Sequence, residues 1–284
     1  MGETAILLIA CPDRPGLVAA VADFIASNGG NITHADQHID AEVGVFFQRV
    51  EFELEGFAIP RDEITARFAP IAEQFGMSFQ LRYSGDISRM AILVSKEPHC
   101  LVDLLSRWRS GEVPASVELV ISNHPTHADT AAFYGVPYHH VPITPANRAQ
   151  QEASLQSLLE DAKVDLVVLA RYMQVLGNDF VSRYPNRIIN IHHSFLPAFT
   201  GSRPYHQAFA RGVKIIGATA HYATAELDQG PIIDQDVTHI SHRDTVDGLV
   251  RKGRDLERVV LARAIRHHLE HRILVYGNKT VVFA

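Results

Sequence analysis

An asparagine and a histidine stand two residues apart in the segment Asn190-Ile191-His192, at the end of a strand-forming run. Alternate side chains of a strand point to the same face, so Asn190 and His192 share one face. An amide and an imidazole placed side by side are suited to donate hydrogen bonds to one developing oxyanion. The alternative is that Asn190 stabilises a turn and His192 satisfies backbone groups, and this segment by itself favours that alternative.

A second segment, His221–Pro231, carries an acid between two expected strands. Gly217–Tyr222 and Ile232–Val237 have the apolar patterns of strands, so Asp228 lies in the loop that joins them. A carboxylate in such a loop can take part in proton transfer, or it can simply stabilise the turn before a Gly-Pro pair. Glu226 competes with Asp228 for the role of the acid.

The 16 histidines raise the question of a metal. The adjacent pairs at 139–140, 192–193 and 267–268 lack the H-E-x-x-H pattern and other short ligand spacings, so no metal site is expected. The segment Ser95–Leu101 follows an expected strand but contains no glycine. Without a Gly-rich turn it is a weak site for phosphate.

Length, composition and charge limit the class of protein. A chain of 284 residues predicts about two domains, and 46% hydrophobic with 20% charged residues is typical of a globular protein. Residues 1–84 contain 5 Lys and Arg against 12 Asp and Glu, which argues against a nucleic-acid partner. No run approaches the ~18 apolar residues of a membrane span. With only 2 cysteines and no signal sequence, a cytoplasmic protein is expected.

Residues 1–84 have the pattern strand, helix, two strands, helix, strand. Ala5–Ala10 is a continuous apolar run of strand length. Leu17–Ile25 has apolar residues at spacings of three and four, and Asn28-Gly29-Gly30 ends this amphipathic helix. The order βαββαβ predicts a ferredoxin-like sandwich. Two helices cover one face of its sheet, which leaves the other face and the edges free to meet another copy.

Residues 88–284 alternate short apolar runs with helical patterns, after the turn-forming segment Tyr83–Asp86. Strands that alternate with helices predict a Rossmann-like, mostly parallel sheet covered on both faces. Ligands bind such sheets beyond the carboxyl ends of the strands, where Asn190 and His192 are expected. The strand-like runs are Met90–Ser95, Val117–Ser122, Leu166–Ala170 and Ile188–Ile191.

The order of these motifs resembles the formyl-tetrahydrofolate transferase and hydrolase superfamily. Asn190-Ile191-His192 leads into Ser194–Pro197, and His221 stands seven residues before Asp228. The resemblance implies that Asn190, His192 and Asp228 form the catalytic set, with a formylated folate as substrate and no cofactor. It also implies that the pterin ring lies against two backbone loops. The corresponding substrate-binding residues are Tyr172, Met173, Gln174, Leu176, His221, Ala225 and Leu227.

The segment Asp13–Val18, followed by Gly29–Ile32, resembles an ACT domain, a module that often binds amino acids. This resemblance implies a regulatory ligand at Asp13, Gly16 and Asn31, with Asp13 holding an ammonium group. It also implies a homo-oligomer assembled at least partly through this module. The alternative is that Asp13 caps the following helix and Gly16 only turns the chain.

An ACT module ahead of a formyl-folate catalytic domain resembles the hydrolases of this superfamily. The resemblance implies hydrolysis of 10-formyltetrahydrofolate to tetrahydrofolate and formate, which supplies purine synthesis and balances the one-carbon folate pools. One alternative is transfer of the formyl group to glycinamide ribonucleotide, but Ser95–Leu101 lacks the glycine-rich loop for that acceptor's phosphate. A non-enzymatic sensor of folate and amino acids is the other alternative. The presence of Asn190, His192 and Asp228 together argues against it.

Overall fold

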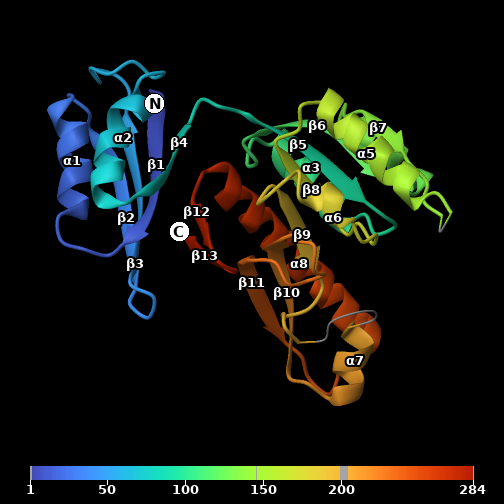
Figure 1. Ribbon diagram of the computed structural model, residues 1–284. Helices are drawn as coiled ribbons and strands as arrows, with labels where there is room; N and C mark the ends of the chain where they lie inside the picture. The colour runs from blue at the N-terminus through green and yellow to red at the C-terminus, as the bar shows by residue number, and fades with distance from the viewer. Residues whose placement is uncertain (1, 145, 199–203, 284) are drawn as a thin grey trace. The chain divides into compact units, whose positions relative to one another are not determined.

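The protein is described by a computed structural model that covers residues 2–144, 146–198 and 204–283 (Figure 1). It divides into two compact units. The first contains residues 1–87, 270–276 and 280–284, and the second contains residues 88–269 and 277–279. The expected ranges of 1–84 and 88–284 differ from this division at the C-terminal end, because most of the last fifteen residues pack with the first unit.

The first unit is a four-stranded antiparallel sheet with two helices on one face, which confirms the βαββαβ prediction. The strand order is β2-β3-β1-β4, so β2 and β4 form the edges. Alternation along β1 explains the packing, since Ala5, Leu7 and Ile9 enter the core beneath the helices. The elements are β1 (Thr4–Pro12), α1 (Leu17–Ser27), β2 (Ile32–Asp40), β3 (Val45–Glu53), α2 (Ile64–Phe75) and β4 (Ser78–Tyr83).

The other face of this sheet is not free as expected. A C-terminal hairpin of β12 (Ile273–Tyr276) and β13 (Lys279–Val282) supplies an apolar cover. Its residue Leu274, together with Phe283, packs against a cluster formed by Ile6, Leu8 and Phe47. The prediction of an open second face is therefore wrong for this part of the sheet. Its apolar side chains are buried within the same chain, which leaves the sheet edges as the remaining free surface.

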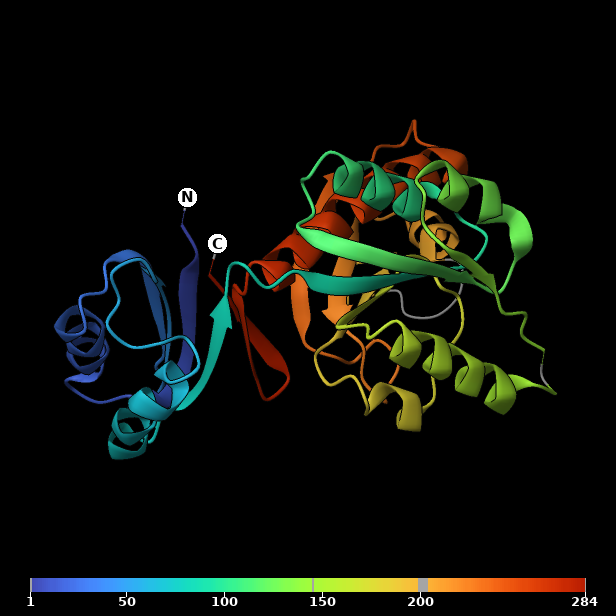
Figure 2. The same ribbon diagram turned by 90° about the horizontal axis from the view of Figure 1, so that it is seen from above.

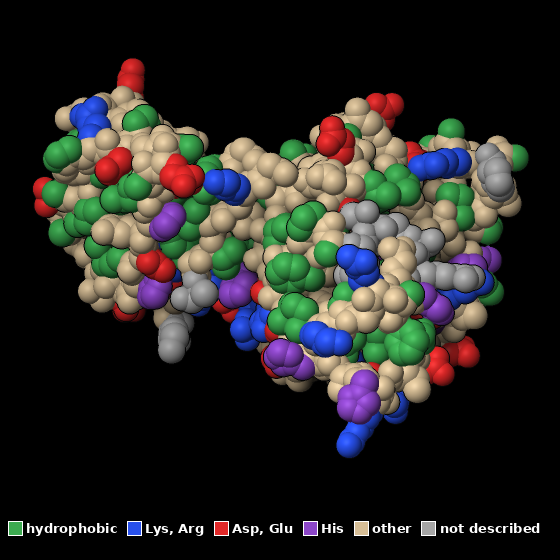
Figure 3. Space-filling model, turned by 90° about the horizontal axis from the view of Figure 1, so that it is seen from below, with side chains coloured by type: hydrophobic (Ala, Val, Ile, Leu, Met, Phe, Trp, Pro, Cys, Tyr) green, Lys and Arg blue, Asp and Glu red, His purple; other side chains and the backbone are tan. Residues whose placement is uncertain are grey.

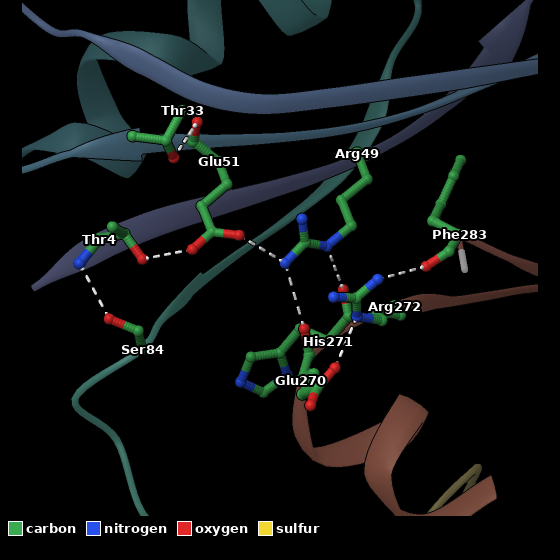
Figure 4. A network of polar contacts seen from close by, with 9 residues as sticks. All are labelled: Thr4, Thr33, Arg49, Glu51, Ser84, Glu270, His271, Arg272 and Phe283. Carbon is green, nitrogen blue, oxygen red and sulfur yellow. Dashed lines mark hydrogen bonds and ion pairs between the residues drawn. The ribbon is translucent and has the colours of Figure 1, made fainter. Parts of the chain in front are cut away.

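A buried arginine on β3 links the sheet to the residues that follow the last helix (Figure 4). Arg49 Nε donates to the carbonyl of His271 at 3.0 Å, and Arg49 Nη2 donates to the carbonyl of Glu270 at 3.3 Å. Nη2 also donates to the carboxylate of Glu51 at 2.9 Å. Glu51 in turn accepts a hydrogen bond from Thr4 Oγ1 at 2.8 Å. This network fixes the start of the hairpin to the sheet.

The second unit is built on a seven-stranded sheet of order β11-β10-β9-β8-β5-β6-β7. Strands β9 to β7 in this order run parallel, and β10 and β11 are antiparallel additions, so the prediction of a mostly parallel sheet is confirmed. Helices α3 and α8 cover one face, and α5 and α6 cover the other (Figure 2). The elements are β5 (Ser88–Val94), α3 (His99–Arg109), β6 (Ala115–Ser122), the 3-10 helix η1 (Pro125–His127), α4 (Ala128–Phe133), β7 (Tyr138–His140), α5 (Arg148–Asp161), β8 (Leu166–Leu169), α6 (Asn178–Val181), β9 (Ile188–His192), α7 (Pro204–Arg211), β10 (Ile215–Tyr222), β11 (Ile232–His239) and α8 (Val246–Leu269).

The parallel strands explain why the candidate residues gather at one edge of the sheet. Strand β8 is apolar and buried along its whole length, whereas β9 begins with two buried isoleucines and carries Asn190 and His192 in its C-terminal half. The polar side chains therefore gather towards the carboxyl ends of these strands and in the loops that follow them. Within the described ranges, no helix is both long and apolar enough to cross a membrane.

Candidate active site

The pairing of β9 with β10 places three polar side chains together. These strands are antiparallel, and their register sets Asn190 opposite His221 and His192 opposite Thr219. Directly opposite residues point to the same face of a sheet, and so do residues two apart on one strand. The expected shared face of Asn190 and His192 is thereby combined with His221 from the neighbouring strand.

Asp228 reaches this group from the loop between β10 and β11. Its Oδ1 lies 3.2 Å from His192 Nδ1 and 3.7 Å from His221 Nε2. Asp228 adopts a left-handed conformation with φ 57°, which Asp tolerates better than most residues. Gly230 is required nearby, because a Cβ there would lie 1.8 Å from the carbonyl oxygen of Tyr222. The loop therefore folds tightly back against the strand and carries Asp228 inward.

Glu226, the competing acid, is exposed, and its backbone carbonyl accepts a hydrogen bond from Thr224 Oγ1 at 3.0 Å. The Asp228 side chain is only 9% exposed and pairs with both histidines. The geometry therefore favours Asp228 as the acid of this group.

Hydrogen bonds set the orientation of His221 and Asn190. His221 Nδ1 lies 2.9 Å from the carbonyl oxygen of Tyr222 and donates to it, because a carbonyl can only accept. In neutral His221 this leaves Nε2 to accept the Asn190 Nδ2–H at 3.1 Å. Asn190 therefore does not hold a turn, and the alternative considered for it does not apply.

His192 has one nitrogen engaged and one free. Its Nδ1 faces Asp228, whereas its Nε2 is buried and has no hydrogen-bond partner among the described residues. A buried polar atom without a partner is rare in proteins and is often explained by a ligand, a water or a catalytic role. His192 lines a cavity of about 240 Å³, so a bound molecule could supply the missing partner.

The two histidines keep Asp228 ionised. Burial by itself would raise the pKa of this carboxyl group, but the interactions with His192 and His221 outweigh it. The pKa of Asp228 is consequently held well below its ordinary value of 3.8. A carboxylate that stays charged near neutral pH can orient His192 by accepting a hydrogen bond from Nδ1–H.

The cavity beside these residues has a largely apolar lining, which suits a flat heteroaromatic ring. Hydrogen bonds hold one wall in place: Gln151 Nε2 donates to Tyr172 Oη at 2.7 Å, and Met173 N donates to Ser95 Oγ at 3.0 Å. Every residue that the sequence assigned to substrate binding lies in the lining. They are Tyr172, Met173, Gln174, Leu176, His221, Ala225 and Leu227.

A second, more open cavity of about 810 Å³ adjoins the first one. The two cavities share Arg171, Met173 and Gln174, so these residues lie at their junction. Basic side chains from Lys96 and Arg148 line the second cavity. Glu97, the one acid among the described residues that line it, forms an ion pair with Arg254.

A buried polar cluster lies next to the junction, and the sequence analysis did not identify it. Glu257 on α8 is 1% exposed and accepts hydrogen bonds from His99 Nε2 at 2.7 Å and Tyr205 Oη at 2.6 Å. Arg171 Nε lies 3.4 Å from the same carboxylate. The sequence feature that could have indicated this cluster is Glu257 itself, a single acid on the otherwise apolar face of a helix.

This cluster also contains the one grouping of potential metal ligands found among the described residues. Donor atoms of His99, Cys100 and Glu257 lie within 4.8 Å of one another. The Arg171 guanidinium beside Glu257 competes with any cation for the carboxylate. Burial, followed by the charge of Glu257, keeps the pKa of Cys100 well above its ordinary value, which disfavours a thiolate ligand.

The residues assigned to a regulatory ligand lie in the first unit. Helix α1 begins after Gly16, whose φ is 95°, and no side chain caps it. The alternative that Asp13 caps this helix is therefore wrong, and the backbone N of Asp13 donates to the carbonyl of Gly44 at 2.9 Å. Asn31 Nδ2 donates to the Glu53 carboxylate at 2.8 Å.

Comparison with known proteins adds family information to this geometry. A model of the formyl transferase family matches residues 88–265, and a model of the ACT domain matches residues 5–68. A formyltetrahydrofolate deformylase from Synechocystis sp. is 58% identical over 281 residues, which cover 99% of both chains.

Solved structures give the same result. A formyltetrahydrofolate deformylase from Pseudomonas syringae pv. tomato superimposes with a TM-score of 0.97 at 48% identity, covering 100% of this chain and 95% of that one. A glycinamide ribonucleotide transformylase from Symbiobacterium toebii matches with a TM-score of 0.67 at 35% identity, covering 72% of this chain and 98% of that one. The fold of the second unit is thus shared by proteins named for two different reactions.

Proposed function

The chain belongs to the formyltetrahydrofolate deformylase family, and we propose that it hydrolyses 10-formyltetrahydrofolate to tetrahydrofolate and formate. The observation that carries the chemistry is the pairing of His192 Nδ1 with Asp228 at 3.2 Å, which leaves His192 Nε2 without a partner at a cavity wall. The released formate would supply purine synthesis.

In this proposal the first cavity holds the pterin end of the substrate. Its apolar lining packs against the ring faces, and its two loops offer backbone groups to the polar ring edge. The loop that contains Met173 is held by its hydrogen bond to Ser95, so the wall is in place before substrate binds. The formyl group would then lie near His192 and Asn190.

The proposed reaction begins with attack of water on the formyl carbon. Asp228 accepts a hydrogen bond from the water or orients it through His192, and protonated His192 donates from Nε2 to the developing oxyanion. Asn190 contributes its second amide N–H to the same oxygen. As the C–N10 bond breaks, N10 receives the proton that the attacking water has lost, delivered by His192 or by Asp228 through water, and the second product leaves as formate.

Transfer to glycinamide ribonucleotide is not favoured. An acceptor with a phosphate requires an anion cradle, and α3 begins after Pro98 without a glycine-rich turn or a side-chain cap. The sensor alternative is also not favoured, since the ionised Asp228 paired with His192 is unnecessary for binding alone. Formate release in the absence of an acceptor distinguishes hydrolysis from both alternatives, because neither a transferase nor a sensor would release it.

We further propose that the ACT domain binds a small amino acid and takes part in a homo-oligomer. Its edge strand β2 is mostly exposed along its length, and hydrophobic side chains lie among the acidic ones on the visible face of the first unit (Figure 3). An unpaired strand edge is a natural site for pairing with another copy. Methionine or glycine would be tested first as effectors.

The function is tested by measuring formate release from 10-formyltetrahydrofolate by the wild type and by Asp228→Asn. We expect the variant to fold and to lose at least about two orders of magnitude in turnover, because an amide cannot hold the charge or the proton. The exposed Asp129→Asn is a matched control with unchanged turnover. If Asp228→Asn keeps more than about a tenth of the activity, Asp228 is only a turn residue.

A further inference from the structure

Arg171 is a buried cation whose hydrogen-bonding capacity is largely unused. Its side chain is 12% exposed, and Nε and Nη1 have no hydrogen-bond partner among the described residues. Its backbone adopts the left-handed conformation with φ 63°, which is uncommon and costly for a residue with a long side chain. Unpaired buried donors and backbone strain at one residue are typical of a functional position.

Glu257, the ion-pair partner of Arg171, does not accept a hydrogen bond from its guanidinium. Glu257 already accepts from His99 and Tyr205, and its distance of 3.4 Å to Arg171 Nε gives an ion pair without hydrogen-bond geometry. Glu257 nevertheless holds the guanidinium in position through its charge. The pair supplies a fixed cation with free N–H groups rather than a saturated structural bridge.

The position of Arg171 is the second observation. It lies at the junction of the two cavities, and both its neighbours in that junction, Met173 and Gln174, belong to the loop already assigned to substrate binding. His192 and Asp228 line the first cavity. The second cavity is more open to solvent. A co-substrate held in the second cavity would have to pass this guanidinium to reach the formyl carbon.

We propose that Arg171, held by Glu257, is a specificity determinant that excludes amines from the formyl carbon and leaves water as the nucleophile. This inference rests on the proposed hydrolysis. The shared fold of a solved transformylase means that the fold of the second unit does not itself select water over an amine. The selection then depends on residues that line the cavities, and Arg171 lies where the two cavities meet.

The chemistry of the guanidinium explains the selection. Arginine offers only donors, so its free N–H groups favour a molecule with lone pairs, such as water or the product formate. An ammonium group also offers only donors and carries the same charge, so a protonated amine is repelled. An amine that did attack would form a new N–C bond, break the C–N10 bond and pass a proton to N10, which would give an N-formyl product instead of formate.

The test compares nucleophiles in the full-length protein. Wild type and Arg171→Gly are incubated near neutral pH with 10-formyltetrahydrofolate and glycinamide, whose amine is largely protonated there, and N-formyl product and formate are both measured. Glycine suits the left-handed backbone and removes the guanidinium. We expect the ratio of N-formyl product to formate to rise by at least about tenfold above the wild-type value.

A matched control separates the guanidinium from the loss of backbone strain. Lys163 is an exposed cation that also has a positive φ, of 49°, and Lys163→Gly should leave the product ratio unchanged. If Arg171→Gly does not fold, Arg171→Asn also removes the guanidinium and tolerates the left-handed backbone, and it should shift the ratio in the same direction. A folded Arg171→Gly or Arg171→Asn that binds folate and gives only formate overturns the proposal. Failure of the wild type to release formate would instead contradict the proposed function.

Discussion

Two buried arginines, one in each unit, differ in how completely their hydrogen bonds are satisfied. Arg49 in the first unit is 3% exposed and donates to Glu51 and to the carbonyls of Glu270 and His271. Arg171 in the second unit is 12% exposed, and two of its nitrogens have no partner in the described part of the chain. Arg49 joins β3 to the residues before the C-terminal hairpin, whereas Arg171 lines two cavities.

The difference shows how a buried charged side chain that stabilises the fold can be distinguished from one that serves a functional site. A buried charge with several good hydrogen bonds is costly to disturb and is explained by the fold that it stabilises. A buried charge with unused donors is not explained by stability, because each unpaired polar group lowers it. The same distinction applies to the histidines, since His192 leaves Nε2 unpaired whereas Nδ1 and Nε2 of His221 both have partners.

The largest effects should come from His192→Ala and Asn190→Ala in the second unit. Each removes a donor to the developing oxyanion, and loss of one such donor costs about 10²–10³-fold in kcat. Steady-state kinetics should show that kcat falls more than KM rises, because these groups act mainly in the transition state. A change confined to KM would instead make the two residues substrate-binding groups.

Arg49→Met should show the opposite behaviour, with lower stability and unchanged chemistry. It leaves two part-buried carbonyls and Glu51 without their donor, so we expect a loss of about 2–4 kcal/mol in the free energy of unfolding. Urea denaturation measures this loss, and Arg82→Met on the exposed surface serves as the control. Formate release per folded molecule should stay at the wild-type level, and a specific loss of kcat would remove the contrast between the arginines.

The pH dependence of stability compares one buried histidine from each unit. Burial, reinforced by Arg171, lowers the pKa of His193 to about 3, and burial with Arg82 and Arg49 lowers that of His271 to about 4. Below the ordinary pKa of 6.5 the unfolded chain binds protons that the folded chain does not, so stability falls as the pH drops from 6.5 towards 4.

The pH prediction is checked by urea denaturation between pH 4 and 7. His193→Gln and His271→Gln should each weaken the dependence on pH, because one of the groups that titrate only in the unfolded chain is removed. The effect should be larger for His193, whose pKa is shifted further. A slope that is the same in both variants and the wild type would show that neither histidine is kept neutral by the fold.

The smallest effect is expected from chelators. Every proposed role is filled by side chains, and the Arg171 guanidinium competes with a cation at the His99, Cys100 and Glu257 cluster. Dialysis against EDTA should leave formate release unchanged. Loss of activity that a divalent metal restores would contradict the metal-free mechanism and the assignment of Arg171 as the cation paired with Glu257.

Local patterns predicted most of the fold but not its long-range contacts. The alternation in β1 and the helical spacing in α1 predicted the first unit, and the order of strands and helices predicted the parallel sheet. The hairpin on the second face was missed, because Phe47 and Tyr276 are far apart in sequence and neither has a pattern that indicates the other.

For the candidate site, the sequence likewise predicted the residues but not the contacts between them. Asn190 and His192 share a face by strand periodicity, and the resemblance added Asp228. Neither could give the free Nε2 of His192, which depends on the tight loop that brings Asp228 to Nδ1. Glu257 and its pairing with Arg171 were missed, because the two residues are far apart in the sequence and meet only in the folded chain.

The most direct test of the hydrolase assignment uses the purified wild type with 10-formyltetrahydrofolate, with and without glycinamide ribonucleotide. Formate and tetrahydrofolate are measured together, alongside any formylated acceptor. We expect formate and tetrahydrofolate in equal amounts at the same rate in both reactions, with no formylated acceptor. Tetrahydrofolate that appears only when the acceptor is present, with no formate, would contradict the assignment and identify a transferase.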